Sequence, residues 1–113
     1  MHPPVLAIRQ TTDGVELDLD IVASLPQLEG HFPDLPIVPG VALLDWVVRF
    51  SAAHLAELRD GTPRFQIKFR RVLQPGARVT LLMRRLVGDR VQFEYRQGET
   101  IYASGILSPP EPT

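Results

Sequence analysis

The chain has 113 residues, of which 44% are hydrophobic and 22% are charged, and its formal net charge is −1 at pH 7. This length fits one domain with one core, and the charge balance gives no support for nucleic-acid binding. The sequence contains no cysteine, which excludes disulfides and thiolate metal ligands. A chain of this size buries a limited share of its surface, so oligomerisation is an ordinary way for it to gain stability.

Residues 1–5 lack the basic region and the long apolar run of a signal peptide. No apolar window in the sequence reaches the length of a membrane span. We therefore expect a cytoplasmic protein with no membrane segment.

Two strands are expected near the N-terminus. Val5–Gln10 forms the first, and Asp13-Gly14 is a typical hairpin turn. Val15–Ile21 then alternates apolar and acidic residues, as a strand with one face in water does.

A proline-rich loop leads into one long helix. Pro33, Pro36 and Pro39 recur at every third position, and each favours an extended conformation in the residue before it. A helix is predicted from Val41 to about Arg59, because glycine and proline follow that point. This helix is apolar on several sides, so we expect other elements to wrap it.

The rest of the chain reads as strands at hairpin spacing, which predicts an antiparallel sheet. The expected strands are Arg64–Arg70, Arg78–Leu86, Val91–Arg96 and Thr100–Leu107. One helix with an antiparallel sheet curling around it is an α+β fold. We expect a single domain over residues 1–107 and a disordered proline-rich tail over residues 108–113.

Groups suited to proton transfer lie on both sides of the junction between loop and helix. The imidazole of His31 can take a proton near neutral pH, and a carboxyl such as Asp45 can give one in a dry pocket. The N–H of Gly40, at the positive end of the helix, can hold a carbonyl oxygen as it gains negative charge. These parts fit proton abstraction beside a carbonyl followed by loss of a hydroxyl as water.

Each of these residues also has a purely structural interpretation. His31 alone would be an ordinary loop hydrogen-bonding residue. Asp45 could stabilise the helix N-terminus by about 0.3–1 kcal/mol, or pair with Arg49 for about 0.2–0.5 kcal/mol. Leu44 and Trp46 flank Asp45, however, and burial of a carboxylate for so small a return favours a functional role.

Two other readings of the motif residues are weaker. The proline spacing fits a polyproline ligand, but Phe32 and its apolar neighbours favour burial. The three histidines, His2, His31 and His54, do not match a zinc-ligand spacing, so no metal site is predicted.

The motif Gly-His-Phe-Pro-x-x-Pro-Ile-x-Pro-Gly-Val over residues 30–41, with Asp45 downstream, resembles a known active-site segment. It is that of the bacterial 3-hydroxyacyl-acyl-carrier-protein dehydratases of the hotdog fold. Residues 67–76 and 103–105 are similar to the later half of the same family. The run Leu44-Asp45-Trp46 looks like that of the small dehydratases that accompany aryl-polyene pigment clusters. The resemblance implies a hotdog fold, with one long central helix wrapped by a curved antiparallel sheet.

The resemblance also implies roles for single residues. His31 is the general base that removes the C2 proton, Asp45 is the acid that protonates the leaving hydroxyl, and Gly40 holds the thioester oxygen. The side chains expected to contact substrate nearby are Phe32, Val38, Val41 and Trp46. No cofactor is expected, because the thioester already acidifies the C2 proton and the acyl group arrives on the phosphopantetheine of an acyl carrier protein.

The family builds each site across a dimer interface, so we expect a homodimer, a higher oligomer, or a heterodimer with a related dehydratase. Lys68, Arg70 and Arg71 could meet the acidic carrier protein or simply form a solvated face. A thioesterase of the same fold and a non-catalytic partner subunit or acyl-binding module stay open as alternatives. Chain length, aryl or aliphatic substrate, and carrier protein or coenzyme A as carrier also stay open.

Overall fold

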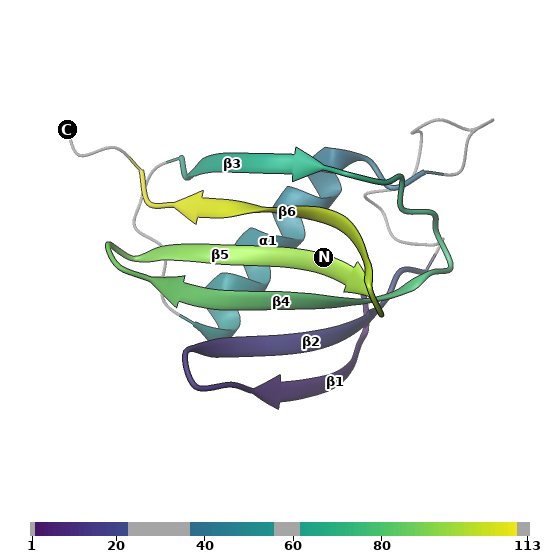
Figure 1. Ribbon diagram of the computed structural model, residues 1–113, viewed down its shortest axis with the longest axis horizontal. Helices are drawn as coiled ribbons and strands as arrows, with labels where there is room; N and C mark the ends of the chain where they lie inside the picture. The colour runs from purple at the N-terminus through teal and green to yellow at the C-terminus, as the bar shows by residue number, and fades with distance from the viewer. Residues whose placement is uncertain (1, 23–36, 56–61, 111–113) are drawn as a thin grey trace.

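In the part of the chain that the structure describes, the predicted strands form one six-stranded antiparallel sheet, and one helix lies against a face of it (Figure 1). The computed structural model describes residues 2–22, 37–55 and 62–110. The elements are β1 (Val5–Gln10), β2 (Gly14–Asp20), α1 (Gly40–His54), β3 (Arg64–Phe69), β4 (Arg78–Leu86), β5 (Arg90–Gln97) and β6 (Thr100–Ser108). Every predicted strand is confirmed to within one residue at each end, and so is the α+β class.

Strand order is where the structure departs from a simple succession of hairpins. The order across the sheet is β1-β2-β4-β5-β6-β3. β3 therefore pairs with β6, while β4 pairs with β2 on its other side. The turn at residues 74–76 joins strands that are not neighbours, because β5 and β2 already occupy both edges of β4.

The pairing of β3 with β6 depends on a glycine. Gly105 lies opposite Ile67 in the register of the two strands. A Cβ atom at Gly105 would lie 2.0 Å from the carbonyl oxygen of Gln66 and 2.9 Å from Cζ of Phe93. Any side chain at this position would force the two strands apart.

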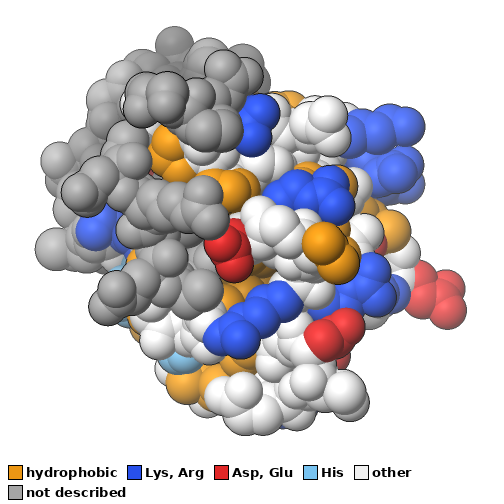
Figure 2. All heavy atoms as spheres, turned by 90° about the vertical axis from the view of Figure 1, so that its left-hand side faces the viewer, with side chains coloured by type: hydrophobic (Ala, Val, Ile, Leu, Met, Phe, Trp, Pro, Cys, Tyr) orange, Lys and Arg blue, Asp and Glu red, His pale blue; other side chains and the backbone are white. Residues whose placement is uncertain are grey.

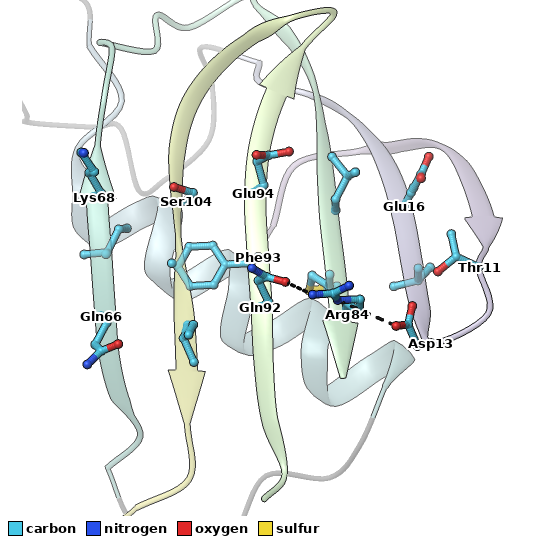
Figure 3. A pocket seen from close by; sticks show the side chains of 16 residues that line it. Thr11, Asp13, Glu16, Gln66, Lys68, Arg84, Gln92, Phe93, Glu94 and Ser104 are labelled. Carbon is cyan, nitrogen blue, oxygen red and sulfur yellow. Dashed lines mark hydrogen bonds and ion pairs between the residues drawn. The ribbon is translucent and has the colours of Figure 1, made fainter. Parts of the chain in front are cut away.

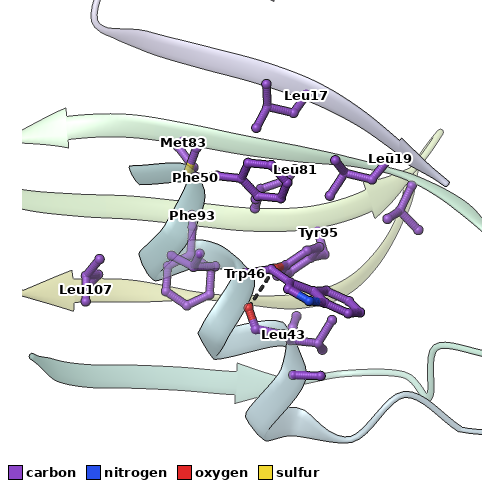
Figure 4. Packing of buried hydrophobic residues seen from close by; sticks show 14 of the residues in the cluster. Leu17, Leu19, Leu43, Trp46, Phe50, Leu81, Met83, Phe93, Tyr95 and Leu107 are labelled. Carbon is purple, nitrogen blue, oxygen red and sulfur yellow. Dashed lines mark hydrogen bonds between the residues drawn. The ribbon is translucent and has the colours of Figure 1, made fainter. Parts of the chain in front are cut away.

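The inward-facing residues of the strands line up in rows across the sheet. One row runs through Leu17, Leu81, Tyr95 and Ala103, which are direct partners in the register and are all fully buried. This face packs against α1, whose buried residues are Ala42, Leu43, Trp46, Val47, Phe50 and Ser51. Figure 4 shows these side chains meeting between the helix and the strands.

The helix is shorter than predicted. It ends at His54, and Leu55 is its C-cap, whose N–H donates to the carbonyl oxygen of Ser51. The predicted end at Arg59 is therefore wrong; the following residues 56–61 lie outside the described ranges. Among the helices of the described residues, none has the length and hydrophobicity needed to cross a membrane.

The sheet covers α1 on one side and leaves the opposite side open. Val41 is 68% exposed, and the side chains of Asp45 and Arg49 are 39% and 49% exposed. We call these three residues, which follow one another at one-turn spacing, the open side of α1. Within the described chain, the wrapping expected for this helix is therefore one-sided.

The last strand runs one residue beyond the domain boundary expected at residue 107. Ser108 is the last residue of β6, and the Nε of Arg64 donates a hydrogen bond to the carbonyl oxygen of Pro109 at 3.1 Å. Of the tail expected over residues 108–113, residues 111–113 lie outside the described ranges.

A polar cluster ties β1 and β2 to β4 on the sheet face away from the helix. Asp18 accepts two hydrogen bonds from the guanidinium of Arg9, both at 2.7 Å, and a third from Oγ1 of Thr80 at 2.8 Å. The bonds from Arg9 and then from Thr80 lower the pKa of Asp18 from 3.8 to about 2. These bonds favour the charged carboxylate, so they stabilise the folded state only while Asp18 is ionised.

We predict that this contribution is present above pH 4 or so and is lost as the pH falls toward 2, because the folded protein binds the Asp18 proton more weakly than the unfolded chain does. Replacement Asp18→Asn should lower the melting temperature at pH 7 and flatten its dependence on pH in the acid range. Asp20→Asn, on the same strand, is the control and should keep the wild-type slope. Equal slopes in wild type and Asp18→Asn would contradict the prediction.

Candidate active site

The start of α1 is held in place by contacts from two other segments. The N–H of Val38 donates to the carbonyl oxygen of Leu73 at 2.7 Å, and Val38 itself is buried. Gly40, the first helical residue, packs against the ring of Phe69, because a Cβ there would lie 2.6 Å from its Cζ. No side chain caps the helix, and the N–H of Ala42 already donates to the carbonyl oxygen of Pro39 at 3.0 Å. The N–H groups of Gly40 and Val41, at the positive end of the helix, are the ones that can serve as donors to a bound oxygen.

Asp45 lies on the open side of α1, and its surroundings differ from the expectation. It comes after the first turn, which holds no acidic residue, so stabilisation by the helix dipole is weak here. Its Oδ2 accepts a hydrogen bond from Nε of Arg49 at 2.9 Å. Both side chains are more than one third exposed, so this pair contributes at most about 0.2–0.5 kcal/mol. The expectation that Leu44 and Trp46 enclose the carboxylate is not met in the chain by itself.

Trp46 lies on the other side of the helix, because successive helical residues point about 100° apart. It is fully buried in the core, and its indole N–H has no hydrogen-bond partner within the described chain. Of the other residues predicted to contact substrate, Val38 is buried and Val41 is exposed beside Asp45. The structure thus brings Gly40, Val41 and Asp45 to the first turns of α1 but separates Trp46 from them. His31 and Phe32 lie outside the described residues.

Tyr95 is a residue near the site that the sequence analysis missed. It points from β5 into the core, and its O–H donates to the carbonyl oxygen of Leu43 in α1 at 2.6 Å (Figure 4). Burial, and to a lesser degree the negative charge of Asp45, raises the pKa of Tyr95 well above its usual value. The alternation along β5 already placed this residue inside. A phenol in an apolar core needs an acceptor, and that requirement was the available signal.

A hollow lies elsewhere, on the face of the sheet away from α1 (Figure 3). It has a volume of about 760 Å³ and is lined from several strands by polar residues such as Gln66, Lys68 and Glu94. Arg84 in this groove is already held by Gln92 and lies near Asp13. Gly40 and Asp45 are not among the lining residues, so the groove is not the predicted site.

The charged residues do not form a metal site in the part of the chain that is described, where no three histidine or acidic side chains cluster. Charges of both signs are mixed on the end of the molecule that carries the β1–β2 and β4–β5 turns (Figure 2). Arg70 and Arg71 instead follow β3 and are exposed; the backbone N–H groups of both donate to the carbonyl oxygen of Tyr102. They stand next to Phe69 in the chain, and the ring of Phe69 contacts the start of α1.

A family model described as ApeI-like, the ApeI dehydratase, matches residues 7–106 of this chain. The chain belongs to the ApeI-like dehydratase family. The predicted resemblance is thereby confirmed, including its narrower assignment to the small dehydratases of the ApeI type.

Individual relatives agree with this family assignment. A 3-hydroxyacyl-[acyl-carrier-protein] dehydratase FabZ of Rickettsia typhi is 32% identical over 65 residues, which cover 50% of this chain and 45% of the relative. The FabZ of Thermotoga maritima is 29% identical over 83 residues, covering 70% and 61%. The chain thus spans about half to three fifths of the length of these curated relatives.

The fold of the ApeI-like chain is also found among solved structures. A chain of the dehydratase heterocomplex ApeI:P from Xenorhabdus doucetiae superposes with a TM-score of 0.82 at 25% identity. The match covers 96% of this chain and 97% of the other. This similarity confirms the predicted hotdog fold.

The buried indole leads to a stability prediction. Trp46→Ala should lower the free energy of unfolding by about 3–5 kcal/mol, because it leaves a large cavity in the core. Trp46→Phe should cost clearly less, because the N–H that it removes has no partner among the described residues. Urea unfolding of the three proteins measures both changes. Equal costs for the two variants would contradict the prediction.

Proposed function

We propose that this protein is a dehydratase that converts a 3-hydroxyacyl thioester, carried by acyl carrier protein, to the trans-2-enoyl thioester and water. The family match over residues 7–106 carries the proposal, because it spans both the His31 loop and Asp45. The FabZ relatives and the similarity to a chain of ApeI:P support the same reaction class. An aryl-polyene or related pigment pathway fits the ApeI-like membership.

In this reaction His31 takes the proton from C2, and the electrons of that C–H bond move toward the thioester carbonyl. The N–H of Gly40, at the start of α1, would hold the oxygen as it gains negative charge. The electrons then form the C2–C3 double bond as the C3–O bond breaks, and Asp45 gives its proton to the departing hydroxyl. Each acid–base group contributes roughly 10²–10⁴-fold. No cofactor is required, because the thioester itself acidifies C2.

The surroundings of Asp45 in the single chain call for a partner. A carboxyl that delivers a proton needs a dry pocket, whereas Asp45 is 39% exposed and paired with Arg49. We propose that a second subunit, a copy of this chain or a related dehydratase, covers the open side of α1 and excludes water there. Arg70 and Arg71, exposed after β3, would face the acidic carrier protein as it delivers the acyl group.

One observation favours a second candidate function. The contact between Asp45 and Arg49 is what an ordinary surface pair on a helix would make. The chain could thus act as a non-catalytic partner subunit whose α1 completes the site of another dehydratase. A thioesterase of the same fold is the remaining alternative, and it would release free carrier thiol.

The decisive measurement is the conversion of 3-hydroxyacyl-carrier-protein thioesters to the enoyl thioester. Mass spectrometry monitors this conversion as the loss of one water. We expect His31→Ala and Asp45→Asn each to lower kcat/KM by roughly 10²–10⁴-fold with the fold intact. The proposal is contradicted if the wild type dehydrates no short, long or aryl chain, either alone or with a related dehydratase subunit.

Arg49→Gln is the matched control for Asp45→Asn, because both remove the same ion pair and only one removes the acid. We expect Arg49→Gln to keep kcat/KM within about tenfold of wild type, far above the Asp45 variant. Similar losses in the two variants would make Asp45 a structural residue and favour the partner-subunit function.

A further inference from the structure

We propose that Tyr95 is a positioning residue for the dehydration. Its hydroxyl fixes the position of α1 relative to β5, and this position places the reacting groups of the helix. The inference rests on the proposed function. It concerns a residue on β5 that lies in the core and does not itself meet the substrate.

The hydrogen bond of Tyr95 joins the sheet to the helix body at the relevant turn. Its acceptor, the carbonyl oxygen of Leu43, lies between Gly40 and Asp45 in the sequence of α1. At 2.6 Å it is a short bond, and both residues are almost fully buried, so water does not compete for it.

This bond adds to the helix rather than building it. The carbonyl of Leu43 can still accept the N–H of Val47 within the helical ladder, since a carbonyl oxygen has two lone pairs. Loss of the phenol hydroxyl therefore leaves the helix itself intact. What it removes is the fixed distance between α1 and β5.

The other large polar group on the buried side of the helix does not replace this bond. The indole N–H of Trp46 has no hydrogen-bond partner within the described residues, so Trp46 fixes α1 by packing alone. Apolar packing tolerates small sliding, whereas a short hydrogen bond sets one register. The contacts of Val38 with Leu73 and of Gly40 with Phe69 hold the start of the helix, one turn earlier.

A shift of α1 would move both the Gly40 N–H and the Asp45 carboxylate relative to the substrate. Misplacement of reacting groups by about 1 Å can cost roughly 10²-fold in rate even when the mutation is remote. These two groups act chiefly as charge and protons move in the transition state, so the loss should fall mainly on kcat.

The test is Tyr95→Phe, which removes the hydroxyl and little else. We expect kcat for dehydration to fall by about 10–100-fold while KM stays within about threefold of wild type. Two variants serve as controls. Val91→Ala truncates another buried residue of β5, and Tyr102→Phe removes the hydroxyl of a half-buried tyrosine that donates to Gln97 on the neighbouring strand. Both should keep kcat within about threefold of wild type.

Stability is separated from positioning in the same experiment. All variants are assayed in one concentration of trimethylamine N-oxide, which favours the folded state, so that rates refer to folded protein. Under these conditions the proposal is overturned if kcat of Tyr95→Phe equals that of wild type, or falls only as far as that of Val91→Ala. A Tyr95→Phe variant that does not fold would make Tyr95 a general stability residue and would also overturn it.

Amide hydrogen exchange gives a readout that does not depend on activity. In Tyr95→Phe we expect faster exchange at residues 44–48 of α1 with β4 and β5 unchanged, while Val91→Ala should not show this local effect. If wild type catalyses no dehydration but the local exchange changes as expected, the proposed function fails, while the role of the Tyr95–Leu43 hydrogen bond in holding α1 on the sheet is supported. Unchanged exchange in α1 would overturn the proposed role of the Tyr95–Leu43 hydrogen bond, whatever the activity.

Discussion

The structure depends on burying one polar group inside an apolar interface. The helix packs on a sheet face made of rows such as Leu17, Leu81, Tyr95 and Ala103, and almost any apolar helix could slide across such rows. A phenol in that position is costly unless it finds an acceptor. The bond from Tyr95 to Leu43 meets this requirement and joins α1 to β5 at one point of the apolar interface.

That placement has a consequence for the opposite side of the helix. Once Leu43, Trp46 and Phe50 face the sheet, helical geometry directs Val41 and Asp45 away from it. An exposed valine beside a half-exposed carboxylate leaves apolar area in water. The same two residues are suited to contact a second subunit. A second subunit on this side of the helix, as proposed, would give a small domain both stability and a dry site.

Much of the local structure follows from short-range patterns. Alternation marked strands such as β2 and β5 nearly to the residue, since a sheet with one face buried imposes a period of two. The place of β3 at the edge beside β6 did not follow, because that pairing joins segments far apart in sequence and needs the missing side chain of Gly105. The helix end at His54 was also missed, because the nearest glycine and proline signals lie several residues later.

For the candidate site, too, some features follow from the local sequence and others only from the tertiary structure. The sequence by itself determined which chemical groups are available, namely His31, Gly40 and Asp45 at fixed spacing around a proline-rich segment. It also determined that Asp45 and Trp46 point in different directions on a helix. Only the tertiary structure decided which of the two is buried, because that depends on the side from which the sheet approaches. That side depends on the strand pairing and on the hydrogen bond from Tyr95 to Leu43. Both join residues that are far apart in the sequence, so no local sequence pattern predicts them.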